Sequence, residues 1–269
     1  MDQAQHLEWE RRIARPAAAA AFAAVAMQVA AQVIVGLAFR DRAEGERGGL
    51  LALDQHASEL AASTAVRALA LALVAATLYY LYRCASHRRD LPPYFLPLLI
   101  AAPVFLAAAA VVTQIQAIDI ASEFTESGAR SEKRAENLLE DRSPVAAAIG
   151  LAGQLSLAFS YIVISLNAMR AGLLSRFMGI LGIIVGVLYV LPLLGGQPVV
   201  EVFWLGALGF LFLGLWPRGR GPAWESGKEE PWPSSQSGLL APAPREEEPD
   251  LPAEDDRPAP RKRKRKRKS

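Results

Sequence analysis

The residues with the clearest capacity for chemistry close the chain, in the run RKRKRKRKS at positions 261–269. A run of this kind attracts phosphate groups, whether they belong to anionic lipid or to nucleic acid. No aromatic side chain interrupts it to stack on bases, which favours lipid over single-stranded nucleic acid. We expect contact with anionic lipid headgroups or an acidic protein partner; nucleic acid and a topology-fixing cluster without a partner stay open as alternatives. The basic residues are Arg261, Lys262, Arg263, Lys264, Arg265, Lys266, Arg267 and Lys268.

An acidic block, REEEPDLPAEDD at 245–256, lies just before this polybasic end and contains seven acidic residues against one basic residue. Each basic residue near an anionic surface gains about 1 kcal/mol, so the acidic block weakens the attraction without abolishing it. The whole segment 217–269 is rich in Pro, Ser, Glu and Arg and poor in large apolar residues. This composition predicts a disordered tail.

A second set of polar residues interrupts two long apolar blocks. Gln28 and Gln32 lie one helical turn apart, and Ser156, Ser160 and Asn167 share one helical stripe. Polar residues at membrane depth bond to neighbouring helices or mark a functional path. Interhelical hydrogen bonding is the simpler interpretation, and a polar track for a small solute is the alternative.

The sequence predicts no catalytic, cofactor or metal site. His6, His56 and His87 belong to different segments that we expect on opposite sides of a membrane, and Cys84 is the only cysteine. Motifs of zinc proteases, serine hydrolases and phosphate-binding loops are not found in the chain. Cys84 could carry a lipid, although a buried thiol is the simpler expectation. We therefore expect a non-enzymatic protein without a cofactor.

The elements that must position these residues are apolar blocks of about 20 residues, the length that crosses a hydrocarbon core of about 30 Å. Of the 269 residues, 52% are apolar, and the charges are concentrated between the blocks. Backbone groups in lipid must be satisfied within a segment, so each block should be helical. The predicted fold class is all-α, a polytopic helical membrane bundle of about six spans. The spans cover residues 17–39, 63–82, 94–114, 144–167, 178–194 and 199–216.

Charge predicts the orientation of these spans. The loops 83–93 and 168–177 are net basic, whereas the loops 40–60 and 119–143 carry five and seven acidic residues against three and four basic ones. The basic loops should face the cytoplasm, together with the N-terminal segment 1–16 and the tail. Alanine richness and the preference for Arg are typical of a bacterial plasma-membrane protein.

Several local features carry their own expectations. Pro16 should open the first helix, since a proline suits a first helical position. The 119–143 loop should extend the third span and add a short surface helix, with a lid over a pore mouth as the alternative. Glu201 should be an interfacial residue at the outer end of the last span. Gly179, Gly182 and Gly186 should let helices approach closely, with the last two spans packing on each other.

The stretch 167–234 contains NAMRAGLLSRFMGILGIIVGVLYVLPL and, further on, GPAWESGKEEPWPS. This stretch resembles a family of uncharacterised bacterial multi-pass membrane proteins, which implies the same architecture and no particular activity. The resemblance depends on Arg170, Arg176, Gly179, Gly182, Gly186, Trp224 and Trp232. Because Trp favours the membrane interface, we expect Trp216, Trp224 and Trp232 to lie along the headgroups, or to be scattered aromatics of a linker.

Overall fold

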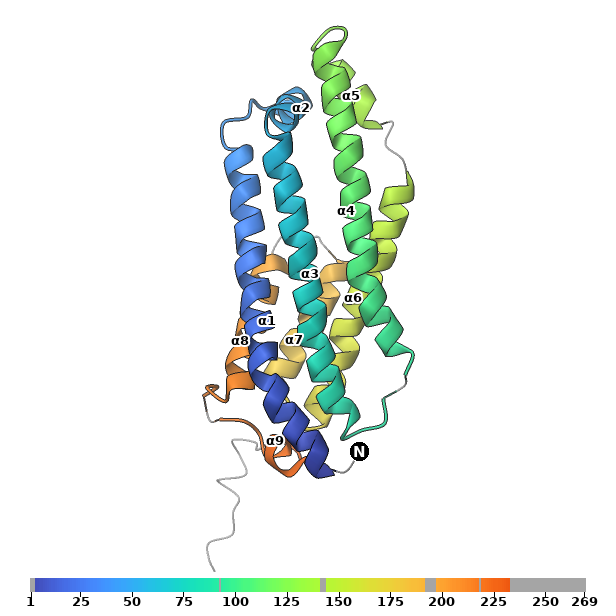
Figure 1. Cartoon of the computed structure of the whole chain (residues 1–269). Helices are drawn as coiled ribbons and strands as arrows, with labels where there is room; N and C mark the ends of the chain where they lie inside the picture. Colours follow the sequence, from blue (N-terminus) through green and yellow to red (C-terminus); the bar gives the residue numbers. More distant parts are fainter. Residues whose placement is uncertain (1–2, 92, 141–143, 192–196, 218, 233–269) are drawn as a thin grey trace, which may run out of the picture. The chain divides into compact units, whose positions relative to one another are not determined.

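The computed structural model describes residues 3–91, 93–140, 144–191, 197–217 and 219–232. Every regular element in these ranges is an α-helix (Figure 1). The elements are α1 (Gln3–Ala38), α2 (Gly45–Gln55), α3 (Ala57–Ser86), α4 (Phe95–Glu126), α5 (Glu132–Glu140), α6 (Pro144–Arg170), α7 (Arg176–Val190), α8 (Gln197–Leu213) and α9 (Ala223–Ser226).

The helices α1, α3, α4 and α6 are long and apolar enough to cross a membrane, whereas α7 and α8 are apolar but shorter. Many large apolar side chains on these helices point outwards, for example Val33, Ile100 and Ile180, each more than half exposed. Apolar surface on this scale is typical of contact with lipid rather than water. The predicted all-helical fold is therefore confirmed, and four of the described helices have the length and apolar composition of membrane spans.

The first helix begins well before the predicted span. α1 runs without a break from Gln3 through Pro16, which lies inside the helix and does not open it. The prediction was wrong because the polar segment before Pro16 is itself made of good helix formers, and its buried residues pack on the bundle. Figure 1 shows α1 bending towards its N-terminal end, as a proline inside a helix produces.

The outer loops are more helical than their polarity suggests. α4 continues for twelve residues beyond the predicted span end at 114, and α5 follows as a short separate helix, as predicted. The amphipathic helix α2, which the sequence analysis did not identify, packs on α4 and α5. Leu50, Phe124 and Ala135 form the small apolar core that joins these three helices.

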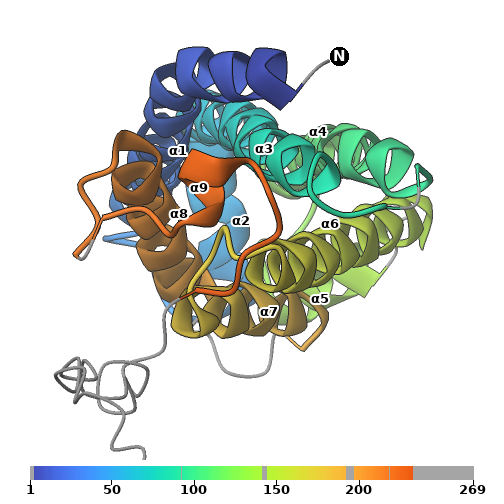
Figure 2. The same ribbon diagram turned by 90° about the horizontal axis from the view of Figure 1, so that it is seen from below.

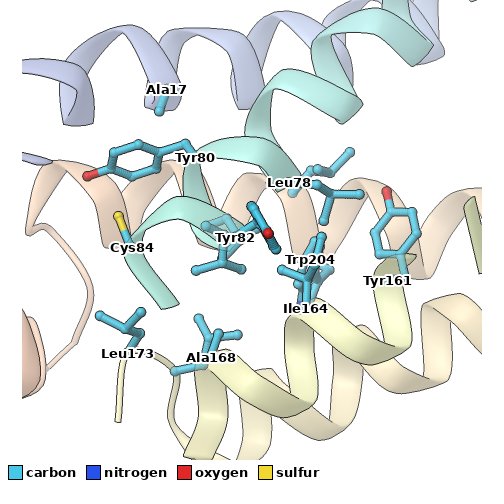
Figure 3. Packing of buried hydrophobic residues seen from close by; sticks show 14 of the residues in the cluster. Ala17, Leu78, Tyr80, Tyr82, Cys84, Tyr161, Ile164, Ala168, Leu173 and Trp204 are labelled. Carbon is cyan, nitrogen blue, oxygen red and sulfur yellow. The ribbon is translucent and has the colours of Figure 1, made fainter. Parts of the chain in front are cut away.

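The main core lies between the long helices and the α7–α8 hairpin. α1 packs chiefly on α3, α4 on α6, and α8 on α1. Figure 3 shows buried aromatic side chains in this core, among them Tyr80 of α3, Tyr161 of α6 and Trp204 of α8. The adjoining ends of α7 and α8 lie about halfway along the long helices (Figure 1), so the other half of the bundle has no contribution from this pair.

The glycines of α7 permit close packing, but chiefly against α6. A Cβ on Gly179 would meet the Met169 side chain, and one on Gly186 would meet the Ala158 carbonyl oxygen at 2.7 Å. Gly182 faces both Ser165 of α6 and Trp204 of α8. The prediction that these glycines pack on α8 was therefore only partly right, because most of them face α6.

The first part of the predicted disordered tail is ordered in the structure. Residues 219–232, including α9, fold back under the bundle, and Figure 2 shows α9 among the ends of α1, α3, α6 and α8. Trp224 is 5% exposed and packs in the core, so it lies neither along headgroups nor in a free linker. Met1–Trp232 is one compact unit. The acidic block 245–256 and the polybasic end 261–268 lie outside the described residues.

Candidate functional site

A cavity of about 710 Å³ lies between α1, α3, α4 and the adjoining ends of α7 and α8. Its walls come from α1, α3 and α4, and its floor comes from Tyr189 at the end of α7 and from the first turns of α8. Most of the lining is apolar. The polar residues that line it are Gln28, Gln32, Arg67, Tyr189 and Glu201.

Glu201 forms the chemical centre of this cavity. It is 3% exposed, and its Oε1 accepts hydrogen bonds from the hydroxyls of Tyr161 at 2.7 Å and Tyr189 at 3.0 Å. The Tyr189 hydroxyl also lies 3.0 Å from Oε2. The expectation of an interfacial Glu201 was therefore wrong: Glu201 lies on the side of α8 that is buried against the bundle, whereas Val199 and Phe203 in the same part of the helix stay exposed.

The two glutamines of α1 both line this cavity. The side chain of Gln28 hydrogen-bonds to Glu201, and its Oε1 is buried without a hydrogen-bond partner in the described part of the chain. Gln32 lies one turn further along the same wall. A buried amide oxygen without a donor leaves an acceptor that a bound molecule can satisfy.

Arg67 brings a positive charge to the same cavity from α3. Arg67 is exposed, and within the described ranges its side chain makes neither a hydrogen bond nor an ion pair. Arg67 and Glu201 thus line one space as opposite charges that are not bonded to each other.

The polar stripe of α6 does not join the cavity. The side chains of Ser156, Ser160 and Asn167 each donate to a carbonyl oxygen four residues earlier in α6. The structure therefore brings together the α1 half of the predicted track and leaves the α6 half outside it. The opposite side of α6 reaches the site, through Tyr161.

A second polar cluster, which we call the basal clasp, lies at the lower end of the bundle and consists of Glu10, Arg88 and Ala223. The Arg88 guanidinium donates to both carboxylate oxygens of Glu10, at 2.6 and 2.9 Å. It also donates to the Ala223 carbonyl oxygen, at 2.8 and 3.1 Å. The clasp thereby joins α1, the segment after α3 and α9.

Aromatic contacts enclose this clasp. The Trp224 indole donates to the Leu173 carbonyl oxygen at 2.9 Å, and the Arg220 guanidinium lies 5.5 Å from its ring centroid. The Tyr80 hydroxyl donates to the backbone carbonyl of Glu10. Cys84 is fully buried nearby, as an ordinary thiol would be.

Two of the three histidines meet beside the clasp. The centroids of the His6 and His87 rings lie 3.8 Å apart, whereas the sequence predicted no common site for these two residues. Burial lowers the pKa of His87, and the neighbouring His6 and Arg83 lower it further against the opposing effect of Glu10. Among the described residues no three His, Cys, Asp or Glu side chains gather in a way that could hold a metal ion.

The sequence analysis missed most of the charged residues that matter here. Glu10 lies in the N-terminal segment 1–16, Arg88 lies in the basic loop 83–93, and Tyr161 lies within the span 144–167, where no local pattern sets these residues apart. A usable signal did exist for Glu201, since an acid within an apolar block is expensive unless it has partners.

Comparisons of the chain with protein-family models, with curated proteins and with solved structures found no match. The function is therefore inferred from the geometry of the cavity and of the basal clasp.

Proposed function

We propose that this protein binds a small amphipathic molecule in the membrane, inside the cavity between α1, α3, α4 and the α7–α8 hairpin. The observation that carries this proposal is the buried carboxylate of Glu201, which faces an apolar cavity together with Gln28 and Arg67. Burying charged and polar groups at membrane depth is costly, and such groups typically mark binding or transport paths.

The size and lining of the cavity support binding of a small molecule. Ligand sites commonly enclose about 300–1,000 Å³, with apolar walls and a few convergent polar groups. The cavity of about 710 Å³ falls in this range. Val29, Val33 and Val199 line it and are also about half exposed or more, so its rim meets the lipid-facing surface. An apolar body with a polar head suits such a lining.

Binding is tested by filling the cavity. Ala107 lines it, whereas the adjacent Ala108 faces outwards. We expect Ala107→Trp to remove a small molecule that co-purifies with the wild-type protein, because the indole occupies the space. Native mass spectrometry of protein released from lipid nanodiscs measures the bound mass, with Ala108→Trp as the matched control. Equal retention by both variants would contradict binding in this cavity.

The proposed setting is a bacterial plasma membrane crossed six times, with both termini in the cytoplasm. The apolar character of α7 and α8 and the basic loops 83–93 and 168–177 support it. A reporter that is active only in the periplasm, fused after Ser269, should stay inactive. The same reporter inserted at Gly128, between α4 and α5, should be active.

A second proposed role belongs to the polybasic end 261–268, whose charge supports contact with anionic lipid or an acidic protein. A photo-cross-linking probe placed within 261–268 in native membranes tests it. Lipid adducts that disappear at high salt are expected. One dominant protein adduct would identify a protein partner instead, and a nucleic-acid adduct would contradict the proposal.

A further inference from the structure

We propose that the molecule held in this cavity is a zwitterion, whose ammonium group binds at Glu201 and whose anionic group binds at Arg67. The inference rests on the proposed function of the cavity and specifies the chemical class of the ligand. Two charged side chains support it, Glu201 and Arg67, each of which lacks a partner of opposite charge among the described residues.

The Glu201 end of the cavity calls for a cationic donor. A carboxylate offers about four acceptor positions. Three neutral groups donate hydrogen bonds to Glu201: the hydroxyls of Tyr161 and Tyr189 and the Gln28 amide. None of the three carries a positive charge that would balance the carboxylate. Within the described residues no Arg, Lys or His lies within ion-pair distance of it. The unpartnered Gln28 Oε1 adds a second acceptor beside it. An ammonium group, with three donors, serves both acceptors.

The Arg67 end calls for an anion. Guanidinium stays protonated at every physiological pH and presents five donors in a fork that fits carboxylate and phosphate. None of the Arg67 donors forms a hydrogen bond with another described residue. An anionic group at the rim of the cavity supplies the partner that the protein does not.

A ligand with only one charge would leave the other fixed charge unpaired. A simple cation would satisfy Glu201 and repel Arg67, and a simple anion would do the reverse. Because a close charged hydrogen bond is a strong contact, losing one of the two should weaken binding by about 10- to 100-fold. A zwitterion keeps both contacts while adding no net charge to the membrane interior.

Two sources could supply this chemistry in a membrane. One is a lipid with a phosphoethanolamine head, whose chains would follow the apolar walls. The other is a free amino acid with an apolar side chain. Both present an ammonium group and an anionic group joined by a short linker, and the experiment separates them.

The test uses the full-length chain in nanodiscs made of equal parts phosphatidylethanolamine and phosphatidylglycerol. Native mass spectrometry measures which lipid stays bound after release. We expect a preference of about tenfold for phosphatidylethanolamine, which falls in Glu201→Gln; because both lipids carry a phosphate, Arg67→Gln should instead lower the total retention of lipid. Arg67→Lys should restore part of it, and Arg47→Gln, an exposed arginine outside the cavity, should leave it unchanged.

The second arm adds leucine to delipidated protein in detergent and measures the thermal midpoint. A rise with leucine that both cavity variants abolish supports the inference with a free zwitterion as ligand. Equal retention of the two lipids, with no effect of leucine, overturns it. Equal stabilisation by leucine and by isoamylamine, its analogue without the carboxylate, overturns it as well. In those cases loss of ligand in Ala107→Trp still supports the proposed function, so the two failures are distinguishable.

Discussion

Two buried glutamates of the same bundle, Glu10 and Glu201, differ in the groups that bind their carboxylates. Glu10, 4% exposed, is held by both terminal nitrogens of Arg88, whose side chain is fully buried. Glu201, 3% exposed, is held by two tyrosine hydroxyls and faces a cavity. The first carboxylate has a cation supplied by the chain, and the second has none among the described residues.

This difference separates a structural charge from a charge available to a ligand. The Glu10–Arg88 pair joins segments that are 78 residues apart, and the same guanidinium ties in the Ala223 carbonyl. Every strong donor of the clasp is used inside the protein. In the cavity, Arg67 carries the opposite charge but is not bonded to Glu201. The Oε1 of Gln28 is an acceptor without a donor among the described residues.

The largest expected effect separates the two glutamates directly. Glu10→Gln should lower the free energy of unfolding by about 3–5 kcal/mol, because it leaves Arg88 buried with a neutral partner. Glu201→Gln should lower it by about 1 kcal/mol or less, since the amide oxygen still accepts from the tyrosines. Titration of folded protein in mixed micelles with increasing SDS measures both.

Glu8→Gln, on the exposed side of the same helix, is the control and should have no measurable effect. Equal losses for Glu10→Gln and Glu201→Gln would make both carboxylates structural and would remove the contrast.

A change in the hairpin should affect the cavity and spare the clasp. A Cβ at Gly182 would meet Trp204 Cζ2 at 2.7 Å, whereas nothing lies within 4 Å of one at Gly206. Gly182→Ala should cost about 1–3 kcal/mol and reduce ligand retention, because α8 carries Glu201. Gly206→Ala should do neither. Protection of residues 219–232 from protease should stay unchanged in both, and its loss in Gly182→Ala would contradict the independence of the two regions.

The smallest effect concerns pH at the clasp. The pKa of His87 is below its usual value in the folded protein, mainly because of burial. The unfolded chain therefore binds this proton more readily, and stability should fall as pH falls below about 6.5, the ordinary histidine pKa. Thermal midpoints at several pH values should show a slope that His87→Gln flattens. An equal flattening by His56→Gln, far from the clasp, would refute the assignment.

The sequence was sufficient for the parts of the fold that follow from local composition. Uninterrupted apolar blocks predict long helices, and the i, i+4 spacing of Gln28 and Gln32 predicts a shared face; both residues line the cavity. The extension of α4 and the short helix α5 also follow from local periodicity.

The remaining contacts join residues distant in sequence, and no local pattern encodes them. Glu10 meets Arg88, and Trp224 meets Leu173, only after the helices have assembled. Residues 219–232 are ordered because of these same long-range contacts. Their polar composition, taken alone, therefore predicted a disordered tail. The buried position of Glu201 depends on which side of α8 packs against the bundle, which composition does not specify.

That short hairpin has a consequence for the surrounding lipid. α7 and α8 contain 15 and 17 residues, which rise about 22 and 26 Å at about 1.5 Å per residue. Both lengths fall short of a hydrocarbon core of about 30 Å. In the proposed six-span arrangement this hydrophobic mismatch draws the nearby leaflet inwards, towards the level of Glu201. Lipid binding should then depend on acyl chain length. Shorter chains lower the free-energy cost of bringing a headgroup to the level of the cavity, and longer chains raise this cost.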